Sequence, residues 1–229
     1  MHSVAIIPAR GGSKRLPRKN IVDFHGRPII GYTIDAALAS GCFERVVVST
    51  EDAEIAGVAI RCGAEVEMRD EALATDAATV DAVCLAFLAR EIAAGRGWTH
   101  MACLYATAPL RTADDIKGVM ALLQPGVCDF AMGVSPYETQ PHIALKFMPD
   151  HSLVPMWPDL IEYRLNDFPP LRTANGTVYA VACDAFRKQE TFYGSGLRGY
   201  DMPRDRAIDI DTAEDLDYAI WLSSRRRKA

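Results

Sequence analysis

The chain has 229 residues, of which 49% are hydrophobic and 24% charged, and its formal net charge is -5. This length suits one domain of α/β size, and the ordinary composition excludes disordered and fibrous proteins. The negative net charge argues against a nucleic-acid binder, because such binding requires many Lys and Arg side chains to neutralise phosphates. Any phosphate chemistry must therefore depend on a local basic patch.

The cysteines and the first apolar run indicate the compartment. The six cysteines are scattered without C-x-x-C spacing, mostly within apolar runs, so we interpret them as reduced core residues. The first apolar stretch, residues 4–9, ends at Arg10 and is too short for a signal peptide or a membrane span. These observations predict a cytoplasmic protein with no membrane partner.

Short β-branched or apolar runs alternate with helical patterns through the first half of the chain. This alternation is typical of a parallel sheet covered by helices on both faces. The strands in this half are expected at residues 4–8, 45–49, 65–68, 101–105 and 130–134. The helices between them are expected at residues 29–39, 53–62, 80–93 and 114–123.

The pattern breaks between residues 136 and 172, where prolines recur and Trp157 appears without helical period. A structureless loop of this length is improbable inside a compact domain. We expect an arm with a small hairpin that turns at Asp150 and His151, and whose apolar side chains bury against a partner chain. The whole chain, residues 1–229, is then one domain with this arm inserted in it.

Beyond residue 172 the chain returns to regular structure. Strands are expected at residues 177–181 and 207–210, and a last helix at residues 213–222. Three helix starts along the chain have the spacing of a capping box, formed by Ser49 with Asp52, Thr112 with Asp115, and Thr212 with Asp215.

A basic, glycine-containing segment leaves the carboxyl end of the first expected strand, where open α/β sheets bind their ligands. It runs from residue 8 to residue 20 with the sequence PARGGSKRLPRKN, and five basic side chains lie between Arg10 and Lys19. The glycines allow backbone N–H groups to approach a polyphosphate, whose charge the basic side chains neutralise. The spacing is neither that of a P-loop nor that of a dinucleotide fingerprint. The alternative is a glycine turn with a solvated basic face.

An acidic pair, Asp209 and Asp211, stands near the end of the chain. If these residues lie on a strand, both carboxylates project from the same face, which suits one hard cation such as Mg²⁺. A nucleoside triphosphate needs that ion to neutralise the phosphates as pyrophosphate leaves. The alternative is an acidic cluster that complements the dipole of the helix starting near Thr212.

Five segments resemble, in order and spacing, the successive motifs of the acylneuraminate cytidylyltransferases. They are residues 7–20 (IPARGGSKRLPRKN), 47–50 (VVST), 107–111 (TAPLR), 175–179 (NGTVY) and 209–212 (DIDT). That family joins CMP from CTP to the anomeric hydroxyl of nine-carbon acidic sugars, such as sialic, legionaminic and pseudaminic acids, with release of pyrophosphate. The resemblance implies a Rossmann-like nucleotidyltransferase fold and a homodimer in which the partner's arm completes each sugar site.

The resemblance also implies roles for single residues. Lys19 would stabilise charge at the α-phosphate of CTP, Asp209 and Asp211 would hold Mg²⁺, and either Asp211 or a metal-bound hydroxide would take the proton. The other nucleotide contacts would come from Arg10, Gly12, Ser13, Lys14, Asn20, Arg69 and Thr79. The sugar would be contacted by Tyr105, Arg164, Asn166 and Asn175. Asn166 stands where the family has Gln, and Tyr105 stands where sialic acid synthetases commonly have Gln.

The segments near the expected sugar site indicate different branches of the family. Residues 104–109 are more similar to the pseudaminic and legionaminic enzymes, whereas residues 175–179 resemble the sialic and legionaminic enzymes. Legionaminic acid is compatible with both segments, although Tyr105 could instead simply fill the core. Two other hypotheses are a cytidylyltransferase for an eight-carbon 3-deoxy-octulosonic acid and a non-catalytic nucleotide-binding module.

Overall fold

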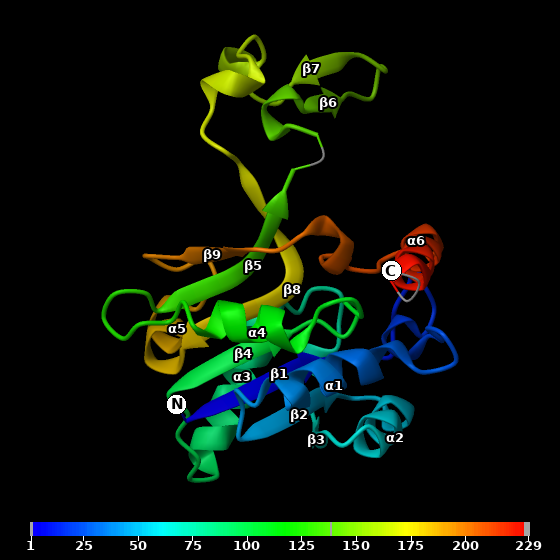
Figure 1. Ribbon diagram of the computed structural model, residues 1–229, viewed down its shortest axis with the longest axis vertical. Helices are drawn as coiled ribbons and strands as arrows, with labels where there is room; N and C mark the ends of the chain where they lie inside the picture. Colours follow the sequence, from blue (N-terminus) through cyan, green and yellow to red (C-terminus); the bar gives the residue numbers. More distant parts are fainter. Residues whose placement is uncertain (1, 138, 227–229) are drawn as a thin grey trace.

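A computed structural model describes residues 2–137 and 139–226, and it has a seven-stranded sheet at its centre (Figure 1). The strands lie in the order β3-β2-β1-β4-β8-β5-β9, and β8 alone runs antiparallel to its neighbours. Their bounds are β1 (Ser3–Pro8), β2 (Arg45–Thr50), β3 (Glu65–Met68), β4 (His100–Leu104), β5 (Phe130–Pro136), β8 (Arg172–Ala182) and β9 (Arg198–Asp201). The predicted mostly parallel sheet is therefore confirmed.

Helices cover both faces of the sheet because side chains along each buried strand alternate between two apolar clusters. On β1, Ala5 and Ile7 belong to one cluster and Val4 and Ile6 to the other. The first cluster receives side chains from α1 (Ile29–Ser40), α2 (Ala53–Arg61) and α4 (Ala113–Met120). The second receives side chains from α3 (Val80–Ala93) and α5 (Cys183–Gln189). The last helix, α6 (Ala213–Arg226), contributes the buried Ala219 to a third, smaller cluster.

Two of the three predicted capping boxes are present. The Thr112 hydroxyl accepts from the Asp115 amide while the Asp115 carboxylate accepts from the Thr112 amide, and Thr212 and Asp215 repeat this exchange. The prediction for Ser49 was wrong. Asp52 is itself the N-cap of α2, accepting from two backbone amides, because Ser49 is still inside the buried strand β2.

The strand predicted at residues 207–210 was also wrong. These residues form an irregular stretch, in which the Ile210 amide donates to the Thr107 carbonyl at 2.9 Å and the Ile210 side chain is buried in the third cluster. The apolar run therefore reflects packing against a loop and α6 rather than pairing in a sheet. The strand at that edge is β9, which is short and largely polar and gave no alternating pattern.

An arm leaves the carboxyl end of β5 and returns through β8, projecting from the body of the sheet (Figure 1). It contains the predicted hairpin, made by β6 (Leu145–Phe147) and β7 (Leu153–Pro155), with His151 in the turn at a φ of 64°. Phe147 on this hairpin is 69% exposed. Across residues 2–137 and 139–226, no helix combines the length and apolar character that crossing a membrane requires.

Candidate active site

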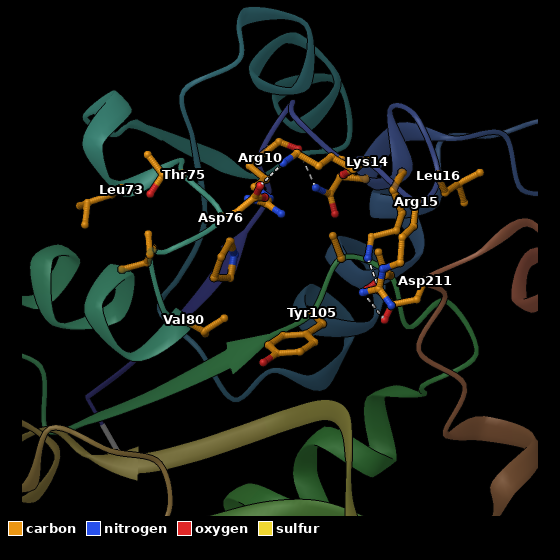
Figure 2. Close-up of a pocket in the computed structure, with 18 of the residues that line it drawn as sticks. Arg10, Lys14, Arg15, Leu16, Leu73, Thr75, Asp76, Val80, Tyr105 and Asp211 are labelled. Carbon is orange, nitrogen blue, oxygen red and sulfur yellow. Dashed lines mark hydrogen bonds and ion pairs between the residues drawn. The ribbon is translucent and has the colours of Figure 1, made fainter. Parts of the chain in front are cut away.

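A pocket of about 450 Å³ opens at the carboxyl ends of β1 and β4 (Figure 2). Parallel strands present their carboxyl ends at one edge of the sheet, so loops that are distant in sequence meet there. The basic segment supplies one wall, the segment around Asp76 a second, and Tyr105 with Thr107 the floor. Asp211 closes the side next to Lys19.

The basic segment is held in place from behind by carboxylates of the turn between β2 and α2 and of the first turn of α2. The Gly11 amide donates to Glu51 Oε1 at 2.7 Å, and the Arg18 guanidinium pairs with Asp52 and Glu54. A side chain on Gly11 would place its Cβ within 3.1 Å of the carboxyl carbon of Asp52, so this close approach needs glycine. Arg18 therefore anchors the loop and leaves the other basic residues free to face the pocket.

Four cations of the loop meet two carboxylates across the pocket. Lys19 Nζ lies 2.5 Å from Asp211 Oδ1, and Arg15 lies 2.7 Å from Asp211 Oδ2. Arg10 and Lys14 both contact Asp76, at 2.7 and 2.5 Å. Burial acts to raise the pKa of Asp211, but Lys19 and Arg15 outweigh it and hold this pKa below its ordinary value. The site therefore places more positive than negative charge around one cavity, as a polyphosphate requires.

Asp209 sits deeper than Asp211, and its pKa is shifted in the opposite direction. Burial raises the pKa of Asp209 to about 6, although the Thr107 hydroxyl, which donates to Oδ1, and the charge of Lys19 act the other way. The two aspartates are not on a strand, so the shared face expected from strand geometry does not apply. Asp211 lines the pocket, whereas Asp209, which accepts from Thr107, lies outside the lining.

Because the pKa of Asp209 is raised, the difference in stability between an Asp209→Asn variant and the wild type should depend on pH. An acid whose folded pKa exceeds its unfolded value stabilises the fold at low pH and loses that contribution as the pH rises through the folded pKa. Without metal, Asp209→Asn is expected to match the wild type below pH 4 and to exceed its unfolding free energy by about 2 to 3 kcal/mol above pH 6. Urea denaturation at several pH values measures this difference.

The matched control for that series is Asp217→Asn, which removes an exposed carboxylate from α6. It should show no comparable change between pH 4 and pH 7. A stability difference between Asp209→Asn and wild type that stays constant over this range would contradict a raised pKa for Asp209.

Arg111 is a buried cation to which the sequence reasoning assigned no role. Its side chain donates to Thr33 Oγ1 at 2.7 Å and to the carbonyl oxygens of Thr177 and Tyr105, tying α1, β8 and the end of β4 together. Desolvation lowers its pKa to about 10. The signal in the sequence was an arginine that directly follows the apolar run ending in TAPL.

Several predicted site residues do line the pocket. Arg10, Ser13, Lys14, Lys19, Asn20, Arg69, Tyr105 and Asp211 all contribute to its wall. Arg69 is buried and pairs with Glu51 at 3.0 Å, and Asn20 Nδ2 donates to the Arg10 carbonyl at 2.8 Å. The Tyr105 ring packs 5.5 Å from that of Tyr179, so it both fills the core and forms the floor.

The other predicted residues lie outside the lining of the pocket. Gly12 is exposed on the loop, and Thr79 caps α3 by accepting from the Ala82 amide. Asn175 on β8 bonds to Ser135 and Thr177. Arg164 and Asn166 are exposed on the arm.

The acidic pair, Asp209 and Asp211, offers carboxylates, which are ligands that Mg²⁺ prefers. Within the part of the chain that the structure describes, no group of three or more His, Cys, Asp or Glu side chains could hold a metal ion. Mg²⁺ is commonly bound in nucleotide sites by one or two carboxylates together with water and substrate phosphates. Asp211, which lines the pocket, is placed to contribute one such carboxylate, whereas Asp209 lies outside the lining.

Comparison with solved structures defines the class of fold. The chain is similar to CMP-2-keto-3-deoxy-manno-octonic acid synthetase complexed with CTP, with a TM-score of 0.72 and 17% identity over 99% of this chain and 100% of that chain. At this identity the likeness concerns the fold alone, and it confirms the expected nucleotidyltransferase fold.

Sequence comparison then gives the family. The family model described as cytidylyltransferase matches residues 4–216, so the chain belongs to the cytidylyltransferase family. It is 34% identical to a pseudaminic acid cytidylyltransferase of Campylobacter jejuni, over 96% of this chain and 95% of that protein. It is 32% identical to the CMP-N,N'-diacetyllegionaminic acid synthase of Legionella pneumophila, over 96% and 94% of the two chains. The resemblance drawn from the five sequence segments is confirmed.

Proposed function

We propose that the chain transfers CMP from CTP to the anomeric hydroxyl of a nonulosonic acid and releases pyrophosphate. The observation that carries this proposal is the pocket in which Arg10, Lys14, Arg15 and Lys19 surround one cavity next to Asp211. The Campylobacter jejuni and Legionella pneumophila relatives, which align over almost their whole length, are named for this reaction and support the same activity here.

Catalysis in this proposal comes from alignment and electrostatic stabilisation, as in other phosphoryl transfers. Arg10, Ser13 and Lys14 bind the outgoing phosphates, and Arg69 with Asn20 positions the nucleotide. Lys19 is the least exposed of the loop cations that contact Asp76 or Asp211, with 19% of its side chain accessible, so its charge is screened least by water. We assign it to the α-phosphate, where negative charge increases as the sugar oxygen attacks.

We propose Mg²⁺ as the cofactor, held by Asp209 and Asp211. When bound, the ion neutralises phosphate charge as pyrophosphate leaves. Asp211, which pairs with Arg15 and Lys19, would offer its carboxylate to the ion, and the two cations would then be available to the triphosphate. Asp209, whose pKa is about 6, is ionised at neutral pH and available as a ligand.

We assign the acceptor to the legionaminic or pseudaminic type, with Tyr105 forming the floor beneath it. Relatives named for both sugars are similar to this chain over their whole length. The eight-carbon 3-deoxy-octulosonic acid is the second candidate, supported by a solved structure of the same fold. We place the reaction in the cytoplasm, because all six cysteines are free thiols, as a reducing compartment favours.

A pyrophosphate-release assay tests the function. Purified protein is incubated with CTP and Mg²⁺ and with one acceptor at a time: sialic, legionaminic, pseudaminic or 3-deoxy-octulosonic acid. We expect release only when CTP, Mg²⁺ and a nine-carbon acid are present together. Release with the eight-carbon acid alone would favour the second candidate, and CTP binding without release from any acceptor would favour a non-catalytic module.

We further propose that the arm of residues 136–172 forms a homodimer. Its hairpin exposes Phe147, Leu153 and Val154 on one small two-stranded sheet, which cannot bury them within the arm. Arg164 and Asn166 lie on the same arm, away from the pocket of their own chain. A partner's arm that reaches across would supply these side chains to the sugar.

Phe147→Asp is expected to convert the dimer to a 25.1 kDa monomer, because it introduces a charge into the apolar contact. Light scattering after gel filtration measures the mass. The control is Ile60→Asp, which alters a 63% exposed apolar residue on α2 outside the arm. A wild type that is monomeric at micromolar concentration, or a Phe147→Asp variant that stays dimeric, would contradict this interface.

A further inference from the structure

Asp76 occupies the mouth of the pocket on a segment that is neither helix nor strand, between the short 3-10 turn Glu71–Leu73 and α3. Its two carboxylate oxygens face different cations: Oδ1 lies 2.7 Å from Arg10 and Oδ2 lies 2.5 Å from Lys14 (Figure 2). These contacts hold the pKa of Asp76 below its ordinary value. A negative group thus already bridges the two cations that the proposed function assigns to the phosphates.

A bound triphosphate and this carboxylate need the same N–H donors. The phosphates carry several negative charges, and repulsion between like charges increases as their separation falls. Asp76 can be displaced because the pairing is exposed: 51% of its side chain and 82% of that of Lys14 are accessible, and exposed ion pairs are weak. The segment that carries it is exposed at residues 75–77, so it can move without breaking a buried contact.

We infer that Asp76 is an exchangeable internal counter-ion of the phosphate site. In the free protein, Asp76 bridges Arg10 and Lys14 at the mouth of the pocket. When CTP binds, these two ion pairs break, and both cations bind the phosphates instead. The return of Asp76 competes with pyrophosphate and so accelerates product release. This inference rests on the proposed function, since it assigns Asp76 to the site that binds the triphosphate.

Asp76 and Asp211 differ in their positions in the pocket. Asp211 contacts Lys19, which is largely buried, and is assigned to remain at the site with the metal. Asp76 contacts Arg10 and Lys14 on the other wall, and among the described residues these two are the ion-pair partners recorded for its carboxylate. Asp76 is therefore a positioning residue that acts through Arg10 and Lys14, and it does not touch the reacting atoms.

The test is Asp76→Asn, which preserves size and removes the charge, compared with Glu71→Gln. Glu71 is exposed on the same segment, so its variant matches the loss of net charge without touching Arg10 or Lys14. Calorimetry with CTP and with inorganic pyrophosphate, at low salt and without Mg²⁺, gives the dissociation constants. We expect Asp76→Asn to bind both about three- to tenfold more tightly and Glu71→Gln to stay within about twofold of wild type.

Two further readouts separate an exchangeable counter-ion from a structural residue. The gain in affinity should shrink as salt is added, because screening weakens the competing pair. It should also shrink in a Lys14→Ala background, where one of the partners of Asp76 is absent. Stopped-flow release of pyrophosphate should be slower from Asp76→Asn than from wild type.

Each outcome of these binding experiments either supports or overturns the counter-ion role of Asp76. Unchanged or weaker binding by Asp76→Asn, with normal CTP binding by wild type, overturns the counter-ion role and leaves the proposed function standing. Equal gains in Asp76→Asn and Glu71→Gln also overturn it, because net charge alone would then explain them. A wild type that binds neither CTP nor pyrophosphate, whether Mg²⁺ is absent or added, overturns the proposed function together with this inference.

Discussion

Lys19→Met is expected to lower kcat by about two to three orders of magnitude, the usual cost of removing one preorganised charge from a developing transition state. Lys19 contacts Asp211 at 2.5 Å from a largely buried position, so water cannot easily replace its charge. Methionine keeps most of the aliphatic stem, which limits packing changes. Steady-state release of pyrophosphate measures kcat, and circular dichroism checks the fold.

Two control variants accompany this prediction: one keeps a positive charge at position 19, and the other removes a lysine outside the site. Lys19→Arg should recover part of the activity, because it returns a cation with a different shape. Lys117→Met removes an exposed lysine of α4 that pairs with Asp114, away from the pocket, and it should leave kcat unchanged. A Lys19→Met variant with wild-type kcat would remove this residue from the mechanism.

Arg111→Met is expected to lower the free energy of unfolding by about 3 kcal/mol. The substitution leaves the Thr177 and Tyr105 carbonyl oxygens without this buried donor, and each unmet polar group costs free energy. It also removes the positive charge that helps to keep Asp209 ionised. Urea denaturation at pH 7 measures the change through the midpoint.

Arg111→Lys should recover only part of this loss, because an ammonium cannot span three acceptors in one plane as a guanidinium does. Arg61→Met, which changes an exposed residue at the end of α2, serves as the control and should alter stability by less than about 0.5 kcal/mol. A midpoint for Arg111→Met equal to that of the control would show that the buried cation is dispensable.

Much of the fold could be predicted because buried parallel strands and amphipathic helices leave strong local patterns. The first four strands and the helices α1 to α4 fall within a few residues of their expected places. Two elements that the sequence did not predict, β9 and α5, share a physical cause. Strand β9 is polar and gains its place by pairing with β5, and α5 is a short helix that directly follows β8, so tertiary context decided both.

The residues of the site also divide into those that the sequence predicted and those that it did not. The basic loop and Asp211 stood out because their residue types are unusual in an acidic chain and after an apolar run. Asp76 did not, because its role depends on its distance from Arg10 and Lys14, and the intervening chain has no period that reveals it. The burial of Arg111 was equally hidden, since a sequence shows an arginine but not what encloses it.

The position of β8 has a consequence for how the chain is made. This strand fills the gap between β4 and β5, yet it is synthesised only after the whole arm. Until residues 172–182 have left the ribosome, the hydrogen-bonding edge of β4 is open, and an open apolar edge is a template for aggregation. A nascent chain halted just before residue 172 should therefore need a chaperone. A chain that includes residue 182 can pair β8 with β4 and β5 and so complete its own sheet.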